Sequence, residues 1–167
     1  CYAAAALAVL TKGPIGLALP GLSAILFLLW RRDLREMLHV RLISGMVLFL
    51  LLCAPWYIYM TVYHGTDFLL NFFGVHNYLR ATVAEHQSTA HWWFYIAMYF
   101  AGFFPWSFFM LPALFRKRKE HGLSFARADM ATQFLLVWGV TVLLVFQLIA
   151  TKYTTYTFPS LFAFAIL

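Results

Sequence analysis

The stretch LISGMVLFLLLCAPWYIYMT, residues 42–61, runs without a single charged side chain. A helix needs about 20 apolar residues to cross the hydrocarbon core of a bilayer, and this stretch meets that length. Comparable apolar runs recur along the chain. The long runs are residues 14–30, 42–61, 92–114 and 131–150, and shorter ones are residues 1–11 and 158–167. The pattern predicts an all-α, polytopic membrane helical bundle with about four full and two partial transmembrane helices.

The composition supports the same class. The chain is 63% hydrophobic and only 11% charged, whereas a soluble domain is about a quarter charged. The net charge of +6 does not indicate nucleic acid, because the basic residues sit beside the apolar runs and so report membrane topology. The two cysteines, Cys1 and Cys53, match neither a disulfide framework nor a zinc spacing.

The chain opens inside one apolar run, without Met, and stops inside another. A cleaved signal peptide would leave a polar start instead. We therefore expect residues 1–167 to be an internal piece of a larger multi-span protein, forming a single transmembrane region. Four prolines lie inside the predicted helices, and because neighbouring helices can satisfy the backbone groups that they free, we expect kinks and not helix ends. They are Pro20, Pro55, Pro105 and Pro112.

The basic residues predict an orientation. Nine of the twelve Lys and Arg residues fall in two loops, residues 31–41 and 115–129, which the positive-inside rule places in the cytoplasm. The outer side then receives the turn at residues 11–13, the long loop 62–91 and the turn 151–157. Trp and Tyr side chains cluster at that same boundary, as an aromatic belt does. They are Trp56, Tyr57, Tyr59, Trp92, Trp93 and Tyr95.

Within the outer loop, residues 67–80 show helical amphipathic spacing. The apolar positions are Phe68, Phe72, Val75 and Leu79, and the opposite positions are Asp67, Asn71, Gly74 and Asn77. The spacing predicts an outer amphipathic helix that lies in the membrane interface.

Three cations remain on the outer side: Lys12 in TKGP, Arg80 in HNYLR and Lys152 in TKYTTYTFP. Each has two readings. It is an interfacial anchor that reaches the headgroups, or it is a charge held to bind an anion. In the second reading Lys152 supplies charge to a phosphate-binding turn, and Tyr153, Thr154 and Tyr156 supply hydroxyl donors.

The polar stretch after the amphipathic helix contains Glu85 and His86. The two are candidates for an acid–base or metal-ligand pair, or they form part of a solvated loop. Further histidines in the loop make a divalent metal possible, although no spacing matches a zinc signature. No cofactor is required by the sequence. No predicted span contains Asp, Glu, Lys or Arg, whereas ion-coupled transporters place such groups near the midplane.

The motifs TKGP, PWY, FFGVHNYLR, EH before WWFY, PW and TKYTTYTFP follow one another in this order. Their order and placement resemble the polyprenyl-phosphate-dependent membrane glycosyltransferases. This group includes the dolichyl-phosphate-mannose protein mannosyltransferases and the aminoarabinose transferases and has the GT-C type of fold. The resemblance implies transfer of a sugar from a polyprenyl-phosphate donor to a lipid, glycan or protein acceptor on the outer face of the cell membrane.

The resemblance also implies site residues. Lys12, Arg80, Lys152 and Tyr156 would lie near the donor phosphate, and Glu85 and His86 would belong to a polar loop that closes the site. The catalytic carboxylate would precede Cys1. A transporter or flippase for a lipid-linked or anionic solute is the competing reading, and a membrane scaffold is a third, which leaves Lys12 and Lys152 unexplained. The sequence upstream would discriminate between the first two, because an outer Asp or Glu after the first span favours the transferase and inverted repeats favour transport.

Overall fold

The computed structural model describes residues 1–32, 35, 41–83, 91–105, 107–108 and 129–167, with the side chains of His76 and Arg80 outside that description. The regular structure of these residues is helical throughout, and they contain no strand. The all-α prediction is therefore confirmed. The chain divides into two compact units, Cys1–Val83 and Ala84–Leu167, and each is described by itself below.

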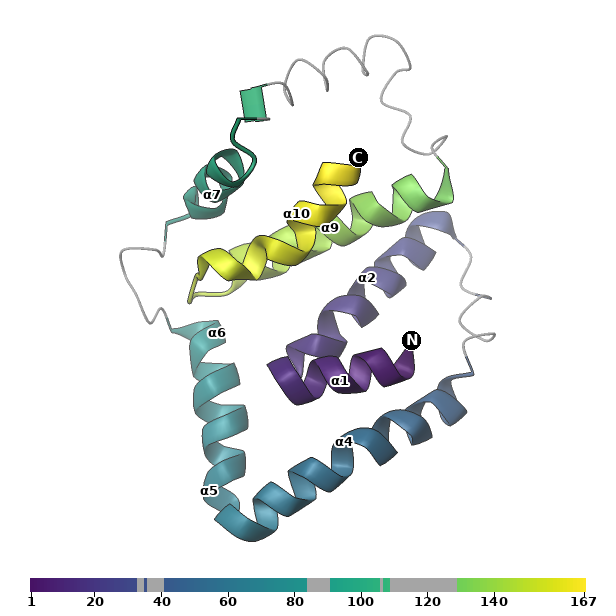
Figure 1. The fold of residues 1–167 in the computed structure, drawn as a ribbon, viewed down its shortest axis with the longest axis vertical. Helices are drawn as coiled ribbons and strands as arrows, with labels where there is room; N and C mark the ends of the chain where they lie inside the picture. Colours follow the sequence, from purple (N-terminus) through teal and green to yellow (C-terminus); the bar gives the residue numbers. More distant parts are fainter. Residues whose placement is uncertain (33–34, 36–40, 84–90, 106, 109–128) are drawn as a thin grey trace. The chain divides into compact units, whose positions relative to one another are not determined.

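The first unit is built around a short helix that lies against two longer ones. Helix α1 (Tyr2–Lys12) packs on α2 (Ile15–Arg31) and on α4 (Leu42–His64), as Figure 1 shows. The buried centre of this packing consists of Ala6, Val9, Phe49 and Cys53. The thiol of Cys53 donates to the carbonyl oxygen of Ala6 over 3.4 Å. Apolar side chains at helical spacing thus explain why α1 docks on α4.

After α4 the chain turns sharply at Gly65 and enters a second helical stretch (Figure 1). This stretch consists of α5 (Thr66–Leu69), the π-helix η1 (Leu70–Leu79) and α6 (Arg80–Thr82). Gly65 has φ 68° and ψ −163°, a region of backbone conformation that is essentially restricted to glycine. The glycine therefore makes the corner between α4 and α5 possible.

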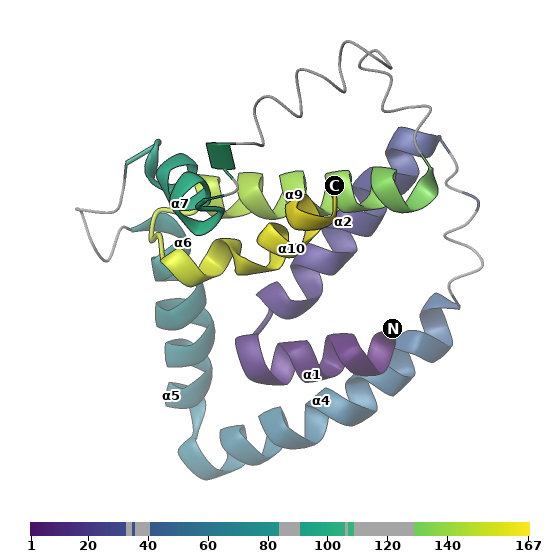
Figure 2. The ribbon, with the colours of Figure 1, turned by 45° about the horizontal axis from the view of Figure 1, so that its top comes forward.

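The second unit contains α7 (Phe94–Gly102), α9 (Met130–Leu148), the 3₁₀ turn η4 (Thr154–Thr157) and α10 (Phe158–Ile166). Helix α10 folds back along α9 (Figure 2). The indole N–H of Trp138 in α9 donates to the carbonyl oxygen of Pro159 over 3.2 Å. Asp129 caps the start of α9, because its carboxylate accepts from the backbone N–H and the hydroxyl of Thr132. These bonds favour the charged form and lower the pKa of Asp129.

Two of the described helices are long and apolar enough to cross a membrane: α4, with 23 residues, and α9, with 19 residues. They coincide with the predicted spans at residues 42–61 and 131–150 to within a few residues. Helix α2 has 17 residues and covers the predicted run at residues 14–30. Pro20 and Pro55 lie inside α2 and α4 without ending them, as expected.

The described part of the predicted span at residues 92–114 is not one continuous helix. Helix α7 ends at Gly102 after nine residues, and Phe103, Phe104 and Pro105 form a turn. Pro105 therefore accompanies a helix end and not a kink. Proline lacks an N–H and its ring collides with the carbonyl four residues earlier, and it also drives the preceding residue away from helical angles. Pro112 lies outside the described residues.

Residues 67–80 are helical as predicted, but the expected faces are only partly right. The π-helix bonds each N–H to the carbonyl five residues earlier, so its faces differ from those of an α-helix. Phe68 and Phe72 are half-buried as expected. Asn77, expected on the opposite face, is half-buried with them. The location of this segment in the membrane interface stays a prediction.

Candidate functional site

Lys12 lies at the end of α1, where the chain turns into α2. Its side chain is exposed, and the next residue, Gly13, has φ 75° and ψ −162°. This conformation again belongs to glycine. The N–H of Gly13 closes the last turn of α1 by donating to the carbonyl oxygen of Val9 over 2.8 Å. The glycine in TKGP therefore sets the position from which Lys12 extends.

The Lys12 turn lies directly against η1. A Cβ atom placed on Gly13 would stand 3.1 Å from Cζ of Phe72 and 3.5 Å from Oδ1 of Asn77. A contact of 3.1 Å is unusually tight for a Cβ atom, so an added side chain would require the Phe72 ring to shift by a few tenths of an ångström. Two motifs that are far apart in the sequence, TKGP and FFGVHNYLR, thus come together in the first unit.

Tyr57, from the PWY motif on α4, completes this junction. Its hydroxyl donates to the carbonyl oxygen of Val9 over 3.2 Å. Its ring packs against Phe68 and Phe72 with centroid distances of 6.4 and 5.6 Å. Sequence reasoning placed Tyr57 in an aromatic belt and missed this role. The only signal was its place in a motif of the resembled family.

Arg80 is the first residue of α6, just beyond Asn77 and Leu79 along the same helical stretch. The backbone of Arg80 therefore continues the helical stretch against which the Lys12 turn packs. The side chain of Arg80 lies outside the described part. Glu85 and His86 also lie outside the described residues.

Lys152 belongs to the second unit and follows the end of α9. Only 5% of its surface is exposed. Its ammonium donates to the carbonyl oxygens of Gln147 over 2.8 Å and Ile149 over 3.1 Å, and it stands 5.8 Å from the centre of the Tyr95 ring. Two of its three N–H donors therefore serve the last carbonyls of the helix, as a C-terminal cap does. Burial lowers the pKa of Lys152.

Tyr156 lies four residues further on and is half-buried. Its ring packs on Phe146 with a centroid distance of 4.7 Å and meets Tyr153 at 5.3 Å. The hydroxyl of Tyr95 in turn donates to the carbonyl oxygen of Tyr153 over 3.3 Å. The turn after α9 is therefore enclosed by aromatic rings, which place Lys152 and Tyr156 in one structured element.

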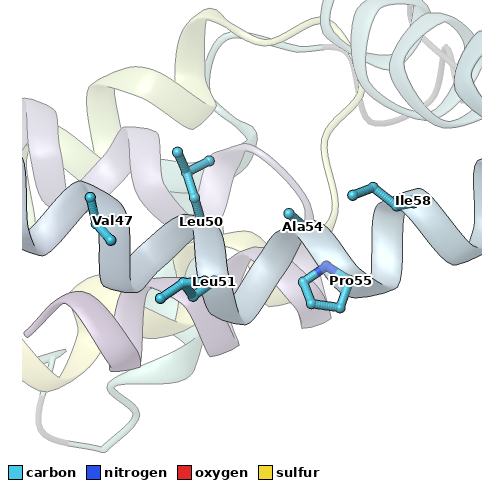
Figure 3. Close-up of a pocket in the computed structure, with 6 residues that line it drawn as sticks. All are labelled: Val47, Leu50, Leu51, Ala54, Pro55 and Ile58. Atoms are coloured by element: carbon cyan, nitrogen blue, oxygen red, sulfur yellow. The ribbon is translucent and has the colours of Figure 1, made fainter.

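No candidate metal centre accompanies these residues in the part of the chain that is described. That part contains no group of three His, Cys, Asp or Glu side chains suited to a metal. A hollow of about 320 Å³ lies along α4, and Figure 3 labels the apolar side chains that line it. They are Val47, Leu50, Leu51, Ala54, Pro55 and Ile58. The lining includes no predicted site residue and offers no group for charge chemistry.

The similarity of these helices to a solved structure identifies the class of fold, a helical membrane fold of the GT-C type. The chain matches ArnT from Cupriavidus metallidurans bound to undecaprenyl phosphate with a TM-score of 0.80 and 26% sequence identity. The match covers 99% of this chain and 29% of that protein. The same protein in the apo state matches with a TM-score of 0.76. No protein-family model matches the chain.

Several relatives of the chain are named as arabinosyl transferases. Undecaprenyl phosphate-alpha-4-amino-4-deoxy-L-arabinose arabinosyl transferase 1 of Pseudomonas fluorescens is 32% identical over 98% of this chain and 28% of that protein. The enzyme of the same type from Erwinia tasmaniensis is 31% identical over 98% of this chain and 28% of its own length. The chain thus spans less than a third of the curated relatives it matches. The resemblance to polyprenyl-phosphate-dependent glycosyltransferases is confirmed.

Proposed function

We propose that the chain is part of a glycosyltransferase that moves a sugar from a polyprenyl-phosphate donor to an acceptor on the outer face of the cell membrane. The similarity in fold to ArnT bound to undecaprenyl phosphate, at 26% identity over 99% of the chain, carries this proposal. The relatives named as arabinosyl transferases support it, and none of the features described favours a transporter. The acceptor is a membrane lipid, a glycan or a protein.

In this proposal Lys12, Arg80, Lys152 and Tyr156 surround the donor phosphate. The phosphate gains negative charge as the sugar departs, and fixed cations in a poorly hydrated site stabilise that charge most strongly in the transition state. The low exposure of Lys152 suits this role, because a charge removed from water interacts more strongly with an anion. The carboxylate that deprotonates the acceptor would be supplied from outside residues 1–167.

The test compares variants of the full-length enzyme in a transfer assay with undecaprenyl-phosphate aminoarabinose, the type of donor named for the relatives. Lys12→Ala and Lys152→Met should each lower the transfer rate at least about tenfold, the loss that about 1.4 kcal/mol of transition-state stabilisation produces. Tyr156→Phe should lower it less, because it removes a neutral donor and no charge.

Arg32→Ala is the matched control, since it removes an exposed cation from the end of α2 that is predicted to face the cytoplasm. Thermal unfolding of each variant identifies any loss of folded protein. Normal transfer rates in both folded lysine variants would refute the phosphate site and leave the interfacial-anchor reading.

A further inference from the structure

Tyr57 touches both elements that bear the outer cations of the first unit. Its hydroxyl donates to the carbonyl oxygen of Val9 in α1 over 3.2 Å. Its ring packs edge-on against Phe72 in η1, with the centroids 5.6 Å apart. Helix α1 ends with Lys12, and η1 continues directly into Arg80. One side chain from α4 thus spans from the lysine-bearing helix to the arginine-bearing one.

The hydrogen bond of Tyr57 acts on the turn that contains Lys12. The carbonyl oxygen of Val9 accepts a second bond, from the N–H of Gly13 over 2.8 Å. Lys12 lies between these two residues inside the same helical turn. Any displacement of the Val9 carbonyl therefore moves the backbone from which the lysine side chain extends.

The other side of the turn is closed by Phe72. Gly13 lies so near this ring that an added Cβ would stand 3.1 Å from its Cζ. Tyr57, Val9, Gly13 and Phe72 therefore form a closed circuit of contacts around the Lys12 turn. The circuit involves three helical elements, and Tyr57 supplies two of its links.

We infer that Tyr57 is a positioning residue that fixes the Lys12 turn against η1, so that the Lys12 ammonium is held in place for the donor phosphate. The inference rests on the proposed function, because it needs Lys12 to bind phosphate. Holding the charge in place before the ligand arrives removes the ordering cost that a mobile lysine would incur on binding.

The decisive variant is Tyr57→Phe, which removes the donor to Val9 and keeps the ring against Phe72. The measurement is the affinity of the full-length enzyme in lipid nanodiscs for undecaprenyl phosphate. Binding should weaken about fivefold, which corresponds to about 1 kcal/mol, the net value of one hydrogen bond. Tyr59→Phe is the matched control, because it removes a hydroxyl from the exposed side of the same helix, and its affinity should not change.

The same substitution in a Lys12→Ala background separates positioning from general destabilisation. A residue that acts through Lys12 has nothing left to position in that background, so Tyr57→Phe should then leave the affinity unchanged. An equal loss in both backgrounds would show a merely structural role and overturn the inference.

Two further outcomes also decide. If Lys12→Ala weakens binding and Tyr57→Phe does not, the inference fails and the proposed phosphate site stands. If Lys12→Ala leaves the affinity unchanged, Lys12 does not bind the phosphate and the inference fails, whereas the part of the proposed site formed by Lys152 is still tested by Lys152→Met. Should Tyr57→Phe not fold, Phe72→Leu replaces it, because it removes the ring against which Gly13 lies and should weaken binding by the same Lys12-dependent route.

Discussion

Lys152 carries a charge that the fold has largely removed from water. Two backbone carbonyls at the end of α9 accept hydrogen bonds from its ammonium, which compensates part of the lost hydration. The sequence showed a lysine in a turn rich in hydroxyl groups and two possible roles for it. It could not show that the carbonyls of Gln147 and Ile149 would converge on the lysine, because that depends on how the chain leaves the helix.

The lowered pKa of Lys152 predicts a pH dependence of stability. Its folded-state pKa lies below the ordinary value of 10.5 because of desolvation. Between these two values the unfolded chain binds more protons than the folded one, so stability rises with pH. Below the folded-state pKa the full penalty of burying the charge is present.

The comparison that isolates this effect is between the full-length wild type and its Lys152→Met variant. The Tm of the wild type relative to the variant should increase as pH rises from neutral towards 10.5. A difference in Tm that stays flat, or that falls with pH, would contradict a burial-depressed lysine.

At the scale of single elements, the two long membrane-spanning helices were predictable from the sequence, whereas the early end of α7 was not. The length of apolar sequence alone identifies α4 and α9, because a bilayer imposes one thickness on every crossing helix. The end of α7 at Gly102 was missed, since a proline in a membrane helix produces either a kink or an end depending on its neighbours. The half-buried Asn77 was missed because the spacing was read as α-helical, whereas η1 is a π-helix.

The corner between α4 and α5 can be tested by adding one methyl group at Gly65. Gly65 has φ 68° and open space where a Cβ would stand, so Gly65→Ala introduces backbone strain and no collision. We expect a loss of about 1–3 kcal/mol in stability and a lower Tm in detergent for the full-length protein.

Gly21→Ala is the matched control for this prediction. Gly21 lies inside α2, also with open space around a Cβ, and alanine in a helix interior is favoured over glycine by about 1 kcal/mol. The control should therefore be neutral or more stable. Equal Tm changes in the two variants would refute the strain argument.

At the scale of the whole molecule, the basic residues predict which loops face the cytoplasm. We expect residues 31–41 and 115–129 to lie inside and residues 62–91 and 151–157 to lie outside. The first two loops contain nine Lys and Arg residues, whereas the segments on the opposite side contain three. The test introduces Ser88→Cys or Arg118→Cys into a full-length protein free of other cysteines. An impermeant thiol reagent applied to intact cells should label position 88 and spare position 118. The reverse labelling pattern would invert the topology.

The sequence predicts the residues of the candidate site but not how they are brought together. Motif order led to Lys12, Arg80, Lys152 and Tyr156, and the structure unites TKGP with the FFGVHNYLR helix in one unit. The contact between Gly13 and Phe72 was not predictable, because it depends on the angle at which the chain leaves α4. That the three cations Lys12, Arg80 and Lys152 share one outer cavity stays a prediction.

The corner at Gly65 also has a stereochemical consequence. Reversing the signs of its angles, φ 68° and ψ −163°, gives the ordinary extended conformation of an L-residue. The corner is therefore the natural conformation of a D-amino acid. A D-alanine installed at position 65 by semisynthesis would keep the backbone angles that its L-enantiomer would distort. Because the space for an L-Cβ is open, the position disfavours L-alanine through its handedness and not through a collision.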